Sequence, residues 1–459
     1  MSSKSADVFL FFLTPVSGRR YHSAAGGGLP RMPKGDPAPA EKTMNPMPKL
    51  AVHGGEKTVK KDFPWPVFDE EDIKAAAEVI RSGQWGDPDC TGLTARFERE
   101  FAAFCGSRFA VASVNGSVAI RLALIAAGVR PGDEILIPPY SFIATASVVL
   151  EANCVPVFVD IDPDTYNIDP AKIEQAMTGK TRAIIPVHFG GQACDMGRIM
   201  AIAGKHRLAV IEDACHAHGA EYKGRRLGSI GDAGCFSFQS SKNLTSGEGG
   251  ITVTDDQDLY KIIASLRNCG RVEGGQWYEH HNLGCNYRMT PLQAALLSRQ
   301  LGRLEEQTRR RDENGRYLAG LLGQIEGISP LPRGHGETLH SYHLFVFRYD
   351  ATKFNHLPKA EFARWLAAEG VPAFMGYPRP LYKQPLFQEK RFFCYAIPPE
   401  VDYANVHCPV AEKACAEEAV WIMQPALLGE RSDMESFAEA IRKIQRYCLS
   451  VSPSSLRTF

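Results

Sequence analysis

LAVIEDACHAHGAEYKGRRLGSIGDAGCFSFQSSKNLTSGEGG, residues 208–250, contains two short apolar runs, and each run ends next to polar residues that can carry chemistry. The first run ends in the carboxylates of Glu212 and Asp213. The second run, CFSF, precedes Lys242, which lies among hydroxyls, an amide and glycines. Short apolar runs bounded by turn residues are typical of buried strands. The stretch therefore predicts two strands of a buried sheet with a site at their carboxyl ends.

Further short apolar runs alternate with helical stretches on the N-terminal side of this region. The runs are EILIPP, VPVFVD and AIIPVH, at residues 134–139, 155–160 and 183–188. Amphipathic patterns predict helices at residues 69–82, 93–104, 170–177 and 195–206, and one that ends at residue 150. Such alternation predicts an α/β fold with a mainly parallel sheet that helices cover on both faces.

The C-terminal part has a different pattern. A long charged helix is predicted at 290–323, followed by the strand-like SYHLFVFRY at 341–349 and by helices at 359–370 and 432–449. We therefore assign residues 49–325 to a large domain and residues 326–459 to a smaller C-terminal α/β domain. Residues 1–48 are rich in glycine and proline, which predicts a disordered extension; a cleaved signal built on the apolar run VFLFFLTPV is the alternative.

Composition excludes several classes of function. The 459 residues include 52 basic and 52 acidic side chains, so no basic footprint for nucleic acid is expected. Twelve cysteines without a CxxC pair indicate reduced thiols and a cytoplasmic protein, and no apolar stretch is long enough to cross a membrane. The tight spacing of CHAHG at 215–219 argues against zinc, and DIDPDTYNIDPA at 160–171 lacks the glycine and glutamate of a calcium loop. No metal site is expected.

Gly116 and Ser117 precede a helical run in VNGSVAIRLALIAAG, so their N–H groups form a candidate phosphate site. An ordinary serine N-cap without a ligand is the alternative. Asp213 can keep a ring nitrogen protonated, because each charge stabilises the other. Lys242 can be a surface residue, or an amine that burial makes nucleophilic. Together these three features match the needs of pyridoxal 5′-phosphate (PLP).

Residues 211–250 and the stretch GCNYRMTPLQAALLSRQL, residues 284–301, closely resemble the DegT family of PLP-dependent sugar and cyclitol aminotransferases. The resemblance extends from about Phe63 to Tyr447. It implies the aspartate-aminotransferase-like fold, PLP-dependent transferase fold type I, and a homodimer with active sites at the subunit interface. KLAVHGGEKTV, FPWPVFDEED and ALLGERSDM are most similar to the inosose aminotransferase and aminohydroxybenzoate synthase branch.

The resemblance also implies a role for individual residues. Lys242 would bond to the cofactor aldehyde and Asp213 would contact its ring nitrogen. The ring hydroxyl would meet His216, Phe142 would stack on the ring, and His343 is a candidate substrate contact. The phosphate would be held by Gly116, Ser117, Ser237 and, from the neighbouring subunit, Asn286.

The predicted function is transfer of an amino group from L-glutamine or L-glutamate to a keto group on a cyclitol or sugar-type ring. Three alternatives stay open: an aminating and aromatising enzyme like aminohydroxybenzoate synthase, a sugar-nucleotide aminotransferase, and a regulatory protein on the same fold. Family dehydratases carry histidine at the position of Lys242, which disfavours a sugar-dehydratase reading.

Overall fold

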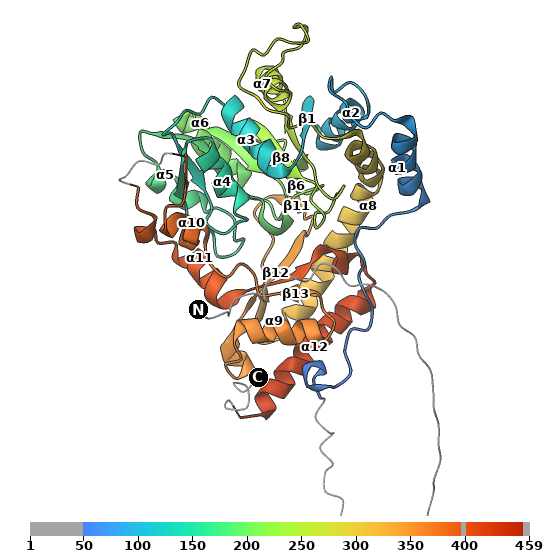
Figure 1. Cartoon of the computed structure of the whole chain (residues 1–459). Helices are drawn as coiled ribbons and strands as arrows, with labels where there is room; N and C mark the ends of the chain where they lie inside the picture. The colour runs from blue at the N-terminus through green and yellow to red at the C-terminus, as the bar shows by residue number, and fades with distance from the viewer. Residues whose placement is uncertain (1–48, 396–400, 453–459) are drawn as a thin grey trace, which may run out of the picture. The chain divides into compact units, whose positions relative to one another are not determined.

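The largest element of the fold is a seven-stranded sheet, seen in the computed structural model, which describes residues 49–395 and 401–452 (Figure 1). The strand order is β1-β9-β8-β5-β4-β2-β3. All neighbours from β8 to β3 pair in parallel, whereas β9 is antiparallel to both β8 and β1. The bounds are β1 Phe109–Ser113, β2 Glu134–Ile137, β3 Val155–Phe158, β4 Thr181–Ile184, β5 Ala209–Asp213, β8 Ala233–Ser237 and β9 Gly250–Thr254.

Helices cover both faces of this sheet, as the sequence pattern predicts. Along β2, Ile135 and Ile137 belong to a core that includes residues of α3 and α4, whereas Leu136 belongs to a core with α2 and α6. Successive side chains of a strand point to opposite faces, so an uninterrupted apolar run signals burial on both. The helices are α2 Leu93–Cys105, α3 Gly116–Ala126, α4 Ala144–Glu151, α5 Pro170–Ala176, α6 Met196–His206 and α7 Gln257–Arg267.

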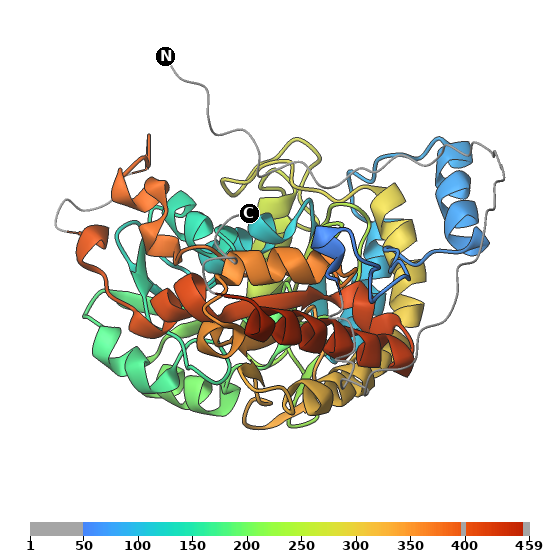
Figure 2. The same cartoon turned by 90° about the horizontal axis from the view of Figure 1, so that it is seen from below.

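A four-stranded antiparallel sheet follows in the C-terminal part, in the order β10-β12-β14-β13. Figure 2 shows α9 (orange) and α12 (red) side by side against it. Phe347, Trp365 and Ile441 form part of the core between them. The bounds are β10 Ile328–Pro330, β12 Leu344–Tyr349, α9 Lys359–Ala368, β13 Ala373–Phe374, β14 Ala419–Met423 and α12 Arg431–Ser450.

Helix α8, Pro291–Leu322, links the two sheets, and it packs against α1 (Glu70–Ser82), α2 and α12 (Figure 1). The helix begins in a capping box in which Thr290 and Gln293 satisfy each other's backbone N–H groups. Apolar residues of both sheets, among them Ile211 and Val346, lie in one core. The predicted domain boundary at 325/326 stays a prediction, and the extension predicted for 1–48 lies outside the described residues.

Three short strands form a third sheet, in the order β11-β6-β7, with β6 at Glu221–Tyr222, β7 at Arg225–Arg226 and β11 at Glu337–Leu339. The pairing of β11 with β6 joins the segment after β5 to the segment before β12. The remaining helices include α10, Pro385–Gln388, and α11, Pro409–Lys413. Within the described ranges, no helix combines the length and apolar character that a membrane span needs.

Candidate active site

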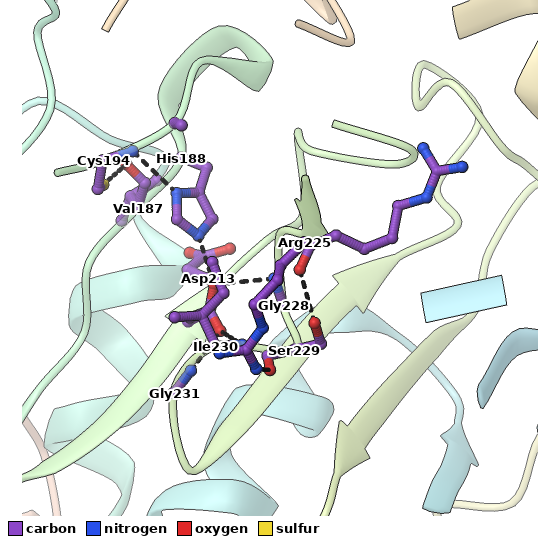
Figure 3. Close-up of polar contacts among 12 residues, drawn as sticks. Val187, His188, Cys194, Asp213, Arg225, Gly228, Ser229, Ile230 and Gly231 are labelled. Atoms are coloured by element: carbon purple, nitrogen blue, oxygen red, sulfur yellow. Dashed lines mark hydrogen bonds and ion pairs between the residues drawn. The ribbon is translucent and has the colours of Figure 1, made fainter. Parts of the chain in front are cut away.

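The two carboxylates at the end of β5 point to different surroundings. Glu212 is fully buried, and its oxygens accept hydrogen bonds from His188 Nε2 at 2.9 Å, Gly228 N at 2.8 Å, and the N–H groups of Ile230 and Gly231, each at 2.6 Å (Figure 3). Burial opposes ionisation of this carboxyl, but the hydrogen bonds outweigh burial and lower its pKa. Glu212 therefore holds the turn before β8, and Asp213 is the carboxylate left for chemistry.

Asp213 is nearly buried and is oriented by two donors. Its Oδ2 accepts from Thr145 Oγ1 at 2.8 Å, and its Oδ1 accepts from the backbone N–H of Cys215 at 3.3 Å. The backbone N–H of His188 donates to the carbonyl of Asp213, so His188 fixes both acidic residues.

Lys242 lies just after β8, in the turn that the sequence predicted. Its backbone N–H donates to the carbonyl of Gln239 at 2.9 Å, and its side chain is half-buried. Burial lowers the pKa of Lys242, while Cys215 and Asp213 act in the opposite direction. The charge of Asp213 therefore acts on Lys242. Because its pKa is lowered, Lys242 loses its proton more readily than an exposed lysine does.

A cradle of backbone lies at the N-terminus of α3. The N-cap is Asn115, whose side chain accepts a hydrogen bond from Val118 N at 2.9 Å. Ser117 is therefore not the N-cap of this helix, unlike in the alternative interpretation of the sequence. Gly116 and Ser117 are the first residues of the helix. A Cβ on Gly116 would lie 2.7 Å from Ser237 Cβ and 3.0 Å from Cys215 Sγ, and a Cβ on Gly250 would lie 2.3 Å from the backbone of Asn115. Gly116, one of the predicted phosphate residues, thus lies against Ser237, and Ser117 is its neighbour in the helix.

The rings of His216 and His343 pack against each other, with centroids 4.2 Å apart and planes tilted by 34°. Burial lowers the pKa of both histidines well below the ordinary value, and the positive charge of nearby groups, including Lys242, lowers it further. Both rings are therefore neutral. His343 Nδ1 lies 3.1 Å from Asn243 Oδ1, and Asn243 donates its amide to Ser341 O. His343 therefore carries its proton on Nδ1, which leaves Nε2 as an acceptor.

Two predicted site residues are exposed in the single chain. The side chain of Phe142 is 58% exposed, and Asn286 is exposed in the segment before α8. Their roles toward the ring and toward a neighbouring subunit stay predictions. Sequence reasoning missed Thr145, Ser141 and Asn243, because hydroxyl and amide residues in loops and at helix starts are ordinary there. The hydroxyls in PPYSFIAT, directly after a predicted strand, were the available signal.

The residues present fit PLP. The close approach at Gly116, Ser237 and Gly250 leaves N–H groups at a helix start for a phosphate. Asp213 is a held carboxylate for the ring nitrogen, and Lys242 is an amine of lowered pKa for the aldehyde. No group of metal-binding side chains occurs in the part of the chain that the structure describes.

Comparison with known proteins agrees with this site. Residues 66–442 match the DegT/DnrJ/EryC1/StrS aminotransferase family. L-glutamine:2-deoxy-scyllo-inosose aminotransferase of Streptomyces paromomycinus is 35% identical over 417 residues, covering 87% of this chain and 98% of that protein. The crystal structure of 3-amino-5-hydroxybenzoic acid synthase has a TM-score of 0.77 and 32% identity, covering 84% of this chain and 99% of that one.

A further solved structure carries the cofactor. NtdA from Bacillus subtilis, with bound cofactor PMP, has a TM-score of 0.71 and 28% identity, and the match covers 84% of this chain and 87% of that one. The match to the family model spans most of the chain, including both sheets. The chain therefore belongs to the DegT/DnrJ/EryC1/StrS aminotransferase family, and it is a PLP-dependent aminotransferase of fold type I.

Proposed function

We propose that the enzyme transfers the amino group of L-glutamine, or of L-glutamate, to a keto group on a cyclitol or sugar-type ring. The observation that carries the proposal is the convergence of Lys242, Asp213 and the Gly116 cradle at the carboxyl ends of adjacent strands. The relative from Streptomyces paromomycinus is named for L-glutamine and for a deoxyinosose ring, which supports this donor and this acceptor class.

Bound PLP supplies an aldehyde that takes up amino groups and a ring that withdraws electrons from the carbon next to them. Gly116, Ser117 and Ser237 hold its phosphate through N–H and hydroxyl groups. Asp213 holds a proton on the ring nitrogen, because a carboxylate stabilises the positive charge there. His216 would contact the ring hydroxyl, and Phe142 would cover the ring face.

Lys242 is proposed to transfer the proton of the donor's α-carbon. Its lowered pKa favours the neutral amine, which can accept a proton from the α-carbon of the donor and return one during amination of the ketone. His343 presents Nε2 as an acceptor, so a hydroxyl-bearing ring can donate to it. This polarity supports a polyol acceptor substrate over an apolar one.

We further propose a homodimer with shared active sites. Exposed apolar side chains, including Leu283 at 98% exposure, lie beside Asn286 in the chain. An apolar groove of about 580 Å³ also lies between α1 and the loop after Lys242, with Phe68, Ile73 and Ile80 in its wall. A second copy of the chain would cover both surfaces and bring its Asn286 to the neighbour's phosphate.

The likeness to 3-amino-5-hydroxybenzoic acid synthase favours a second candidate, amination coupled to aromatisation of the ring. The two candidates differ in product, since transamination leaves the carbon skeleton and its hydroxyls unchanged whereas aromatisation removes water. Mass spectrometry of the aminated ring therefore distinguishes them.

The first experiment is the absorption spectrum of the purified enzyme with PLP, before and after L-glutamine or L-glutamate, without any ketone. Loss of the PLP band with one donor, and its return when a ring ketone is added, is the expected result. Lys242→Ala should bind PLP and keep its fold but lose at least about 10³-fold in turnover, because no other amine can move the proton. Undiminished transamination by Lys242→Ala would refute the assigned role.

A further inference from the structure

We propose that Thr145, supported by Ser141, is a positioning residue that fixes the Asp213 carboxylate against the ring nitrogen of bound PLP. The proposal rests on the assignment of Asp213 above and extends it to two residues outside the predicted site. All three side chains are at most 5% exposed, so bulk water does not compete for their hydrogen bonds.

The directions of the hydrogen bonds among Ser141, Thr145 and Asp213 follow from the number of protons that each side chain can donate. An ionised carboxylate only accepts, so Thr145 must use its single hydroxyl proton in the 2.8 Å bond to Asp213 Oδ2. In the 2.8 Å contact between the two hydroxyls, Ser141 must then be the donor and Thr145 the acceptor. The result is a one-way chain from Ser141 through Thr145 to Asp213, in which each bond polarises the next.

The chain leaves Asp213 one oxygen for a ligand. Oδ2 is held by Thr145 at 2.8 Å, and Oδ1 receives the longer 3.3 Å bond from Cys215 N. A carboxylate oxygen accepts more than one hydrogen bond, so Oδ1 has capacity for a ring N–H. Without Thr145, the carboxylate could rotate about its terminal bond and lose the orientation that the ring nitrogen requires.

The position of Thr145 argues against a purely local role for its hydroxyl. Threonine inside a helix commonly bonds back to a carbonyl of the preceding turn. Here the hydroxyl instead meets a carboxylate 68 positions away in the sequence. The loop before α4 is kept in place by Tyr140, whose ring packs against Phe189 at 4.9 Å and Tyr377 at 5.4 Å between centroids.

The same helix start carries the predicted ring-stacking residue. The backbone N–H of Thr145 donates to the carbonyl of Phe142 at 3.2 Å. The Thr145–Asp213 bond therefore ties the loop expected to cover one face of the ring to the strand end expected to hold its nitrogen. Thr145 thus links two contacts with the same cofactor.

The test compares Thr145→Val, which keeps shape and removes the hydroxyl, with Thr145→Ser, which keeps the hydroxyl. The readout is the NMR chemical shift of the isotopically labelled ring nitrogen of bound PLP, which reports whether that nitrogen is protonated. We expect Thr145→Val to shift this signal toward the unprotonated form and to lower kcat about 10- to 100-fold, the range for a hydrogen bond to a charged group, with KM for the donor little changed. Thr145→Ser should restore both values.

Controls separate this inference from the assignment of Asp213. Asp213→Asn should shift the ring-nitrogen signal more than Thr145→Val does. A normal signal in Thr145→Val together with a shifted one in Asp213→Asn overturns the role of Thr145 alone. A normal signal in Asp213→Asn overturns the assignment of Asp213 and this inference with it. If Thr145→Val does not fold, Ser141→Ala decides: a smaller shift in the same direction supports the chain, and no shift contradicts it.

Discussion

Gly116 has a strict steric requirement at the start of α3. Any side chain there would overlap Ser237, and Ser237 cannot retreat because β8 is paired on both sides. Gly250 has the same kind of constraint against the backbone of Asn115. These glycines are needed for close approach of two backbones, a role that a sequence pattern alone does not distinguish from an ordinary turn.

Gly116→Ala should weaken PLP binding at least about tenfold, because the added Cβ displaces the helix start from Ser237. The dissociation constant of PLP, measured by fluorescence titration of the apoenzyme, checks this. Gly204→Ala in α6 is the matched control, since no atom lies within 4 Å of its Cβ position. Wild-type affinity in Gly116→Ala would show that the cradle is not the phosphate site.

Strand β5 ends in the two neighbouring carboxylates of Glu212 and Asp213, which make different contacts. Asp213 faces Thr145 and the neighbourhood of Lys242, whereas Glu212 points the other way, into the turn that leads to β8. Because successive side chains of a strand point to opposite faces, the proposed catalytic carboxylate, Asp213, and the buried carboxylate of Glu212 face different surroundings. Glu212 keeps the two neighbouring strands β5 and β8 in register, so that Asp213 and Lys242 emerge at the same edge.

Replacing Glu212 by glutamine should destabilise the protein at neutral pH by about 2–4 kcal/mol, because buried N–H groups lose a charged acceptor. The pKa of Glu212 is lowered in the folded state, so its contribution is complete above the unfolded pKa and is lost as the pH falls through the folded value. The melting temperatures of wild type and Glu212→Gln should therefore converge on acidification.

The control for this pH series is Glu71→Gln, whose carboxylate is exposed on α1 and should change stability by less than about 0.5 kcal/mol. If the difference in melting temperature between wild type and Glu212→Gln stays constant from neutral to acidic pH, Glu212 is not ionised in the folded protein as assigned.

Strands, helices and their order could be predicted because apolar runs and caps are local signals. The predicted helix at 195–206, for example, is capped by Asp195 and spans Met196–His206. Lys242 and Asp213 were found because they follow strand-like runs. The role of the Thr145 hydroxyl could not be predicted in this way, since the carboxylate that it contacts lies 68 positions away and only the folded sheet brings the two together.

In the proposed homodimer, the role expected of Asn286 at the neighbouring subunit's phosphate can be tested by mixing two variants. Asn286 is exposed, and its side-chain oxygen accepts a hydrogen bond from Arg288 N at 3.5 Å. If it acts on the neighbour's phosphate, Asn286→Ala and Lys242→Ala should each be nearly inactive alone. Mixed after unfolding and refolding together, they should regain activity, because one site of each mixed dimer has both residues.

The expected recovery is about one quarter of wild type, since half of the dimers are mixed and each has one intact site. Coexpression of both variants with different affinity tags isolates the mixed dimer for measurement. The same pair, refolded separately and then combined, is the control. No recovery in the purified mixed dimer would place Asn286 in the site of its own chain.

The antiparallel strand β9 has a consequence for the order in which the enzyme matures. Because β9 inserts between β8 and β1, Gly116 meets Ser237 and Gly250 only after segments far apart in the chain have paired; Thr252 Oγ1, for instance, donates to the carbonyl of Ala119, 133 positions away. Contacts between such distant segments form late, since closing long loops costs entropy before any contact repays it. We therefore expect PLP to bind only after β9 has paired with both β8 and β1, because the proposed phosphate site does not exist before then.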